Sequence, residues 1–156
     1  MLDERLLFPN AEQLQRAFRG DTAVSASADL TGASSAMIPL HRKRSAAIQL
    51  MRQPDLVSGN QFRAAVRDLV ATEGELTALA ATIDRTVARI LQGRRRVSGV
   101  WHAETVGMVI SRMAELWLNY LDSNRHQDAF WIARISDAYN CLIADLATGP
   151  RLPPDM

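Results

Sequence analysis

The apolar residues between positions 62 and 90 recur in alternating steps of four and three, and this repeat constrains the fold more than any other feature. The repeat comprises Phe62, Val66, Leu69, Leu76, Ala80, Ile83, Val87 and Ile90, with Glu73 as its one charged member. A spacing of this kind places the side chains along one face of a long helix, as in a helical bundle or coiled coil. Ser58 is a suitable N-cap for that helix, and Gly93 is a suitable end.

The rest of the chain also predicts helices, and it carries no strand pattern. The expected helices are a short one after Pro9-Asn10, one from Pro39 to about Gln53, one from about Glu104 to Asp122, and one from about Gln127 to Thr148. Pro39 is expected in a first helical turn because its missing N–H is harmless there. Short connections make consecutive helices antiparallel neighbours. The sequence therefore predicts an all-α fold: an antiparallel bundle of four main helices plus a short N-terminal helix.

The predicted long helix exceeds its neighbours in length. Roughly 34 residues at ~1.5 Å each span about 50 Å, whereas the two helices that follow are shorter by a third or more. The domain organisation expected from composition is a short helix and a Ser/Ala-rich linker or lid over 1–36, a bundle over 37–150, and a tail over 151–156. An overlong helix either bends or pairs with a second copy of the chain.

Composition excludes several classes of protein. Hydrophobic residues make up 47% of the 156 residues, which argues against disorder, and the net charge of +1 argues against nucleic-acid binding. The single cysteine, Cys141, allows no internal disulfide and no thiolate zinc site. We find no metal-binding motif, phosphate loop or dinucleotide fingerprint, no secretory leader, and no apolar run that could span a membrane. We therefore expect no metal, no cofactor and a cytoplasmic location.

Glu73 is the most informative single position, because a carboxylate within an apolar face must be paired, protonated or close to water. One interpretation is a bend or solvated gap beside Gly74, and another is a pocket carboxylate with a shifted pKa. The third is an ion pair with an arginine, for which Arg112 is the natural partner. Arg112 would otherwise be an exposed residue that forms a weak pair with Glu115.

Two further segments carry polar groups of interest. Around the start of the predicted helix near 104, Trp101, His102, Glu104 and Thr105 either line an anion site or supply ordinary capping. His41 precedes the charged run 42–44, which together with the arginines at 94–96 forms a small basic patch. Such a patch is usually a solvated surface, although it is compatible with an anionic ligand.

The order of these segments resembles the bacterial family catalogued as domain of unknown function 4254 (DUF4254), over about residues 38–152. The matching motifs are Leu40-His41, Ile83-Asp84, the stretch from His102 to Met113 that follows the pattern His-x-Glu-Thr-x-Gly-x-x-x-Asp-Arg-Leu, and the closing Gly149 with Arg151. Ser111 stands where that pattern has an acid. The resemblance implies a helical fold and points to Thr105, Gly107 and Arg112, and it implies no activity.

Two classes of function follow from these observations. The first is a non-catalytic accessory protein that binds a small molecule or a protein partner. We expect it to be a homodimer, because the long helix extends beyond its neighbours and one packing face within a single chain cannot cover all of the aromatics Trp117, Tyr120, Phe130 and Trp131. The alternative is a cofactor-independent enzyme with His41, Glu73, His102, Glu104 and Arg112 as candidate catalytic residues. In either case we place the pocket between the middle of the long helix and the next helix, with Glu73, Trp101, Thr105, Gly107 and Arg112 as ligand-binding residues.

Overall fold

The computed structural model describes residues 8–21, 28–91 and 105–148, and within these ranges every regular element is helical. The elements are α1 (Ala11–Phe18), α2 (Ala28–Met51), a single 3-10 turn η2 (Pro54–Leu56), α3 (Gly59–Ile90), α4 (Val106–Ser123) and α5 (His126–Thr148). The expectation of an all-α bundle with one dominant helix is confirmed. None of the described helices combines the length and apolarity that crossing a membrane requires.

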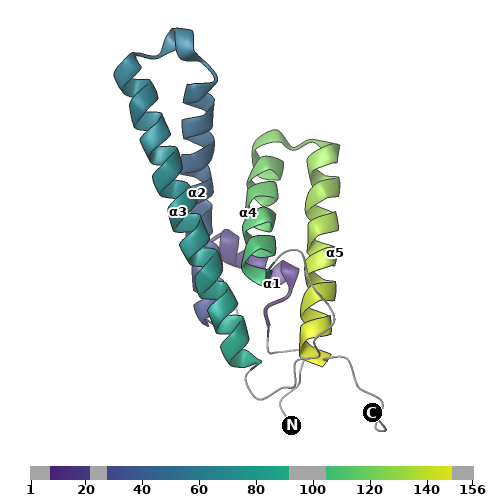
Figure 1. The fold of residues 1–156 in the computed structure, drawn as a ribbon. Helices are drawn as coiled ribbons and strands as arrows, with labels where there is room; N and C mark the ends of the chain where they lie inside the picture. The colour runs from purple at the N-terminus through teal and green to yellow at the C-terminus, as the bar shows by residue number, and fades with distance from the viewer. Residues whose placement is uncertain (1–7, 22–27, 92–104, 149–156) are drawn as a thin grey trace.

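The helices form two antiparallel hairpins, α2–α3 and α4–α5, with α1 packed against α2, α4 and α5 (Figure 1). The α2–α3 hairpin projects well beyond the turn that joins α4 to α5. The core lies where the two hairpins meet, and its fully buried side chains include Leu14, Leu30, Met37, Ile83, Ile110, Met113 and Tyr139. The projecting end of α2–α3 therefore has no second layer from the described part of the chain.

Local sequence signals set the helix ends. Ser58 and Gln61 form a reciprocal capping box at the start of α3, as the N-cap prediction required. Thr105 caps α4 by accepting a hydrogen bond from the backbone N–H of Met108 at 3.2 Å. Asn124 ends α4 in the left-handed conformation with φ 49°. Gly93, the predicted end of the long helix, lies outside the described residues, and α3 ends at Ile90.

The prediction that a helix begins at Pro39 is wrong, because α2 begins at Ala28 and Pro39 lies inside it. Residues 28–36 are thus helical rather than a linker or lid, and residues 22–27 lie outside the described ranges. An interior proline costs about 3 kcal/mol. Burial of Leu30, Met37 and Ile38 in the core offsets that cost, because each buried apolar side chain contributes roughly 1.5–3 kcal/mol. Core packing therefore makes this segment helical, although its Ser/Ala-rich composition predicts a linker or lid.

The N-terminal part of the described chain is attached to α5. The buried hydroxyl of Tyr139 donates a hydrogen bond to the carbonyl of Pro9 at 2.7 Å, and the backbone N–H of Ala11 donates to Asn140 Oδ1 at 2.9 Å. Burial raises the pKa of Tyr139, which keeps its hydroxyl protonated as a donor. These contacts join residues about 130 positions apart and close the bundle across α1.

The buried face of α3 differs from the predicted repeat in its first half. The buried residues of this helix are Ala65, Thr72, Leu76, Ala80, Ile83, Thr86 and Val87. Thr72 therefore takes the buried position that the repeat assigned to Glu73. A straight helix of 3.6 residues per turn drifts by about 20° per heptad against a 3.5-residue repeat. Because of this drift, Phe62, Val66 and Val70 lie beside the face that packs on α2, and we call these three residues the uncovered stripe.

Candidate functional site

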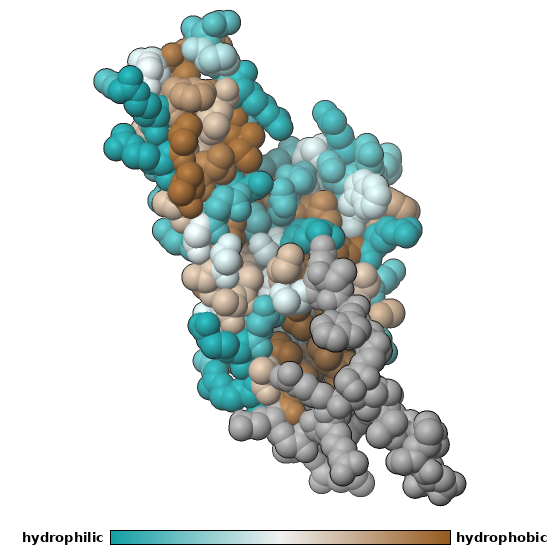
Figure 2. Space-filling model, viewed as in Figure 1, coloured by the Kyte–Doolittle hydropathy of each residue, from teal (hydrophilic) through white to brown (hydrophobic). Residues whose placement is uncertain are grey.

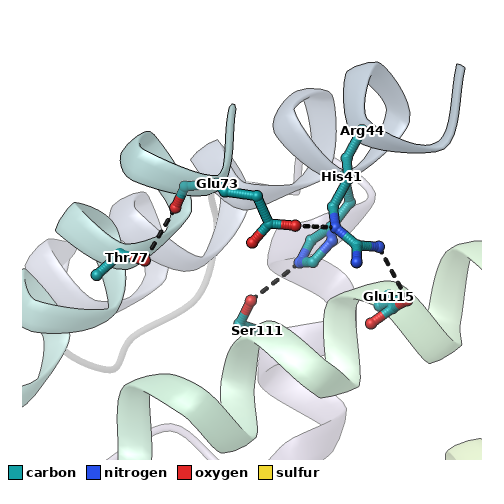
Figure 3. Close-up of polar contacts among 6 residues, drawn as sticks. All are labelled: His41, Arg44, Glu73, Thr77, Ser111 and Glu115. Atoms are coloured by element: carbon teal, nitrogen blue, oxygen red, sulfur yellow. Dashed lines mark hydrogen bonds and ion pairs between the residues drawn. The ribbon is translucent and has the colours of Figure 1, made fainter. Parts of the chain in front are cut away.

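Five polar side chains from three helices meet where the two hairpins join (Figure 3), and we call this cluster the polar junction. His41 and Arg44 come from α2, Glu73 from α3, and Ser111 and Glu115 from α4. His41 Nε2 lies 3.0 Å from Ser111 Oγ. Arg44 donates from Nε to Glu73 and from Nη1 to Glu115, the latter at 3.4 Å. Arg44 thus links both hairpins.

Helical spacing explains why these groups meet. His41 and Arg44 are three residues apart on one face of α2. On α4, Gly107, Ser111 and Glu115 follow one another at intervals of four and share a face. Gly107 is the point at which α4 touches α3, since an added Cβ would lie 2.2 Å from the carbonyl oxygen of Ala80. The glycine therefore permits the close approach of a neighbouring helix, and the backbone of Ala80 fills the space that a ligand would need.

His41 is held as a neutral ring. It is only 7% exposed, and burial is the main reason that its pKa is lowered from the usual 6.5. Glu115 and Glu73 oppose this shift, while Arg44 adds to it. The buried Nδ1 atom has no hydrogen-bond partner. A buried acceptor without a partner is better tolerated than a buried N–H without one, which favours the tautomer in which Nε2–H donates to Ser111.

Arg44 rather than Arg112 is the partner of Glu73, which corrects the predicted Glu73–Arg112 pair. The Glu73 side chain is 51% exposed, so it reaches solvent while it pairs with Arg44. Arg112 lies on an exposed part of α4, and Glu115 also pairs with Arg44. These ion pairs are partly exposed and contribute at most about 1 kcal/mol each. Their main effect is on the arrangement of the helices, because one guanidinium contacts both α3 and α4.

A carboxylate of this same chain already occupies the N-terminus of α4, where a ligand anion would bind. Asp84 Oδ1 of α3 accepts a hydrogen bond from the backbone N–H of Gly107 at 2.8 Å. With Thr105 as N-cap, two of the first backbone donors of α4 are satisfied by side chains. The structure therefore favours capping over an anion site at this position. Trp101, His102, Glu104 and the arginines at 94–96 lie outside the described residues.

The chemistry available to the polar junction is limited. A serine 3.0 Å from a neutral imidazole has the spacing of a nucleophile and its base. Ser111, however, lies in the middle of α4, where backbone N–H groups bond to the preceding turn and cannot receive an oxyanion. The arrangement fits a structural connection between hairpins better than it fits acyl transfer.

The described surface is hollowed elsewhere, on the projecting end of the α2–α3 hairpin. An open groove of about 580 Å³ is lined by Asn60, Phe62, Arg63, Val66 and Arg67 of α3. Apolar side chains gather on this end of the molecule, with hydrophilic side chains around them (Figure 2). Phe62 is 37% exposed, Val70 is 68% exposed, and Val66 between them is half-buried. Sequence reasoning missed this groove because it assigned Phe62 and Val66 to the core.

The aromatic surface expected for a dimer is smaller than predicted. Trp117 is buried and packs on Phe18, with ring centroids 5.7 Å apart, and Tyr120 is half-buried. Phe130 and Trp131 remain exposed, together with Leu121. Phe130 already contacts Trp131 edge-on at 5.3 Å and lies beneath the Arg134 guanidinium at 6.0 Å.

Comparison with protein-family models, curated proteins and solved structures yields no match to this chain. The resemblance to the family of unknown function therefore stays a prediction. Two of the positions that it aligns, His41 and Ser111, are in contact in the structure.

Proposed function

We propose that this protein is a non-catalytic accessory protein that binds a protein partner through the projecting end of its α2–α3 hairpin. The observation that carries the proposal is the uncovered stripe, Phe62, Val66 and Val70. Contiguous exposed apolar surface with a polar border is typical of interaction sites. A groove along a helix suits a partner that presents an apolar helix face.

The uncovered stripe continues the face of α3 on which α4 packs. Residues 62, 66, 70, 73, 77, 80 and 84 recur in steps of three and four and therefore share one side of the helix. At the lower end of this face, Ala80 and Asp84 contact Gly107 of α4. At its upper end, the three apolar residues have no helix over them within the described chain. A partner helix would complete the layer that α4 begins.

Photo-crosslinking tests this proposal without knowledge of the partner. A photoreactive amino acid is placed at Phe62 or Val70 and, as matched controls, at the exposed positions Asp68 and Glu75 on the other side of α3. We expect one discrete adduct in the protein's own host cell from positions 62 and 70 and none from 68 and 75. Equal adducts from all four positions, or none at 62 and 70, would contradict the proposal.

Self-association is a separate part of the proposal. We propose a homodimer whose contact includes Leu121, Phe130 and Trp131, the exposed apolar residues at the α4–α5 end. Sedimentation equilibrium at micromolar concentration should give about twice the 17.3 kDa chain mass, and Trp131→Glu should lower it toward the monomer. A wild-type protein that sediments as a monomer would exclude the dimer.

A cofactor-independent enzyme is the second candidate, and the contact between His41 and Ser111 is the observation in its favour. If His41 activates Ser111, a fluorophosphonate probe should label wild-type protein, and Ser111→Ala and His41→Gln should each abolish the labelling. We expect no labelling, because the α4 backbone around Ser111 has no free donors for an oxyanion. Labelling that both variants remove would favour the enzyme.

A further inference from the structure

We propose that the occupant of the uncovered stripe is an amphipathic helix of a partner protein with carboxylates along one edge of its apolar face. This inference rests on the proposed function and specifies the chemistry of the partner. It is drawn from the charges that border the stripe and from the way in which α4 occupies the lower part of the same face.

The border of the stripe is basic on its open side. Arg63 directly follows Phe62, and Arg67 directly follows Val66, so the two arginines lie one turn apart on the same flank of α3. Both are exposed, and both line the groove together with Asn60. None of the residues that line this groove is acidic. A helix placed on the stripe would therefore have one edge alongside two guanidinium groups.

Glu73 shares the face of the stripe three residues beyond Val70, but it already pairs with Arg44 of α2. The other nearby acidic residues of α3 point elsewhere. Asp68 and Glu75 follow Val66 by two and nine residues, which places them on the opposite side of the helix. The other flank of the stripe is closed by α2, which packs along α3 (Figure 1). The positive charge of Arg63 and Arg67 is thus available to an occupant of the groove.

The described chain already contains one helix seated on this face of α3. In the lower part, α4 lies against Ala80, and its carboxylate Glu115 pairs with an arginine at the edge, Arg44. Because Arg44 comes from α2, this pair lies at the flank opposite to Arg63 and Arg67. A partner helix on the upper part would form the same kind of pair at the open flank, with its own carboxylates on Arg63 and Arg67. Guanidinium groups hold carboxylates in defined geometry, so the pairing would set the register of the partner helix.

A second copy of the same hairpin fits the groove less well. When two identical helices pack antiparallel about a two-fold axis, the same flank of each helix faces its counterpart. Arg63 and Arg67 would then lie beside the same two arginines of the other copy. Like charges at such positions oppose association. A partner helix with carboxylates along this edge would instead be attracted to the two arginines.

A display library of helical peptides tests this inference. The library fixes an apolar stripe and varies one edge among Glu, Gln and Lys, and it is selected on full-length protein and counter-selected on Val70→Glu. We expect enrichment of Glu at the edge. For a selected peptide, Arg63→Gln with Arg67→Gln should weaken binding about 2- to 30-fold, the range expected for two exposed ion pairs. Arg63→Glu with Arg67→Glu should shift the selected edge to Lys.

Four outcomes would overturn the inference. Enrichment of Gln or Lys edges on wild-type protein would show that the arginines do not select the partner. Equal affinity of the double Gln variant for an acidic-edged peptide would show the same. Concentration-dependent self-association that Val70→Glu abolishes would identify a second copy as the occupant. If peptides bind but the edge is not selected, the proposed function stands, whereas absence of both peptide binding and adducts at 62 and 70 contradicts both. Circular dichroism of each variant verifies that the fold is intact.

Discussion

The two halves of α3 present the same kind of apolar face to different surroundings. In the C-terminal half, Ala80, Ile83 and Val87 are buried between α2 and α4. In the N-terminal half, Phe62 and Val70 are exposed, although their spacing along the helix is just as regular. The difference follows from the lengths of the helices, since α3 has 32 residues and α4 has 18. Periodicity reports which face is apolar, and the length of the neighbour decides how much of that face is covered.

Gly107 and Gly74 sharpen this comparison, because Gly107 of α4 packs on the covered half of α3 and Gly74 lies near the uncovered half. An added methyl group at Gly107 would lie 2.2 Å from the backbone oxygen of Ala80, which cannot move as a flexible side chain would. Gly107→Ala should therefore destabilise the protein by about 3 kcal/mol. Urea denaturation measures the change, and wild-type stability of this variant would show that α3 and α4 do not pack closely.

His41 gives the next largest effect, and it depends on pH. Because the folded pKa of His41 is below that of the unfolded chain, the unfolded state binds more protons once the pH falls below about 6.5. Stability should be unaffected by this group above that pH and should decrease progressively as the pH falls toward its folded pKa.

His41→Gln keeps a donor for Ser111 and removes the titration. It should cost about 1–2 kcal/mol at pH 7 through lost packing, and its stability should fall less steeply between pH 7 and pH 5. Urea denaturation across this range compares it with wild type and with His126→Gln, a variant at the exposed histidine that should retain the wild-type slope. Parallel pH profiles for wild type and His41→Gln would contradict the prediction.

Gly74→Ala should have a smaller effect of the opposite sign. The sequence suggested a bend or gap at this position, but α3 is helical throughout Gly59–Ile90, and an added Cβ at Gly74 would meet no atom within 4 Å. The substitution should stabilise the protein by up to about 1 kcal/mol, the difference in helix propensity. Thermal unfolding measures this gain, and a loss of stability would restore the idea of a special conformation at Gly74.

Val70→Ser should have the smallest effect on stability, within about 0.5 kcal/mol, because Val70 is 68% exposed. The matched variant in the covered half, Val87→Ser, removes a buried side chain and should cost several times more. Calorimetric unfolding of the two variants compares the halves of α3 directly. Equal losses would mean that the uncovered stripe is buried in solution by another chain.

Features with local causes could be predicted from the sequence. The caps at Ser58 and Thr105 depend on backbone groups within three residues, and both are confirmed. The start of α2 could not be predicted, because it depends on core packing of Leu30 and Met37, which are distant from their neighbours in sequence.

The candidate site was harder to predict, for the same physical reason. Arg44 belongs to a charged run that is typical of a solvated surface, yet it links α3 to α4. Ser111 was notable only as a departure from a family pattern, and its contact with His41 spans 70 residues. Glu73 was singled out correctly as unusual, but its position in the buried seam was wrong because the helix drifts against a strict heptad.

The long-range attachment of α1 has a consequence for the order in which the chain acquires structure. The α2–α3 hairpin is built from contacts between consecutive helices, so it can form as soon as both have been synthesised. The bonds from Tyr139 to Pro9 and from Ala11 to Asn140 require α5, which the ribosome delivers last among the described helices. Until then the nascent hairpin exposes the apolar residues destined for α4 as well as its uncovered stripe. The interval between translation of α3 and translation of α5 is therefore the period in which this chain is most open to aggregation or chaperone binding.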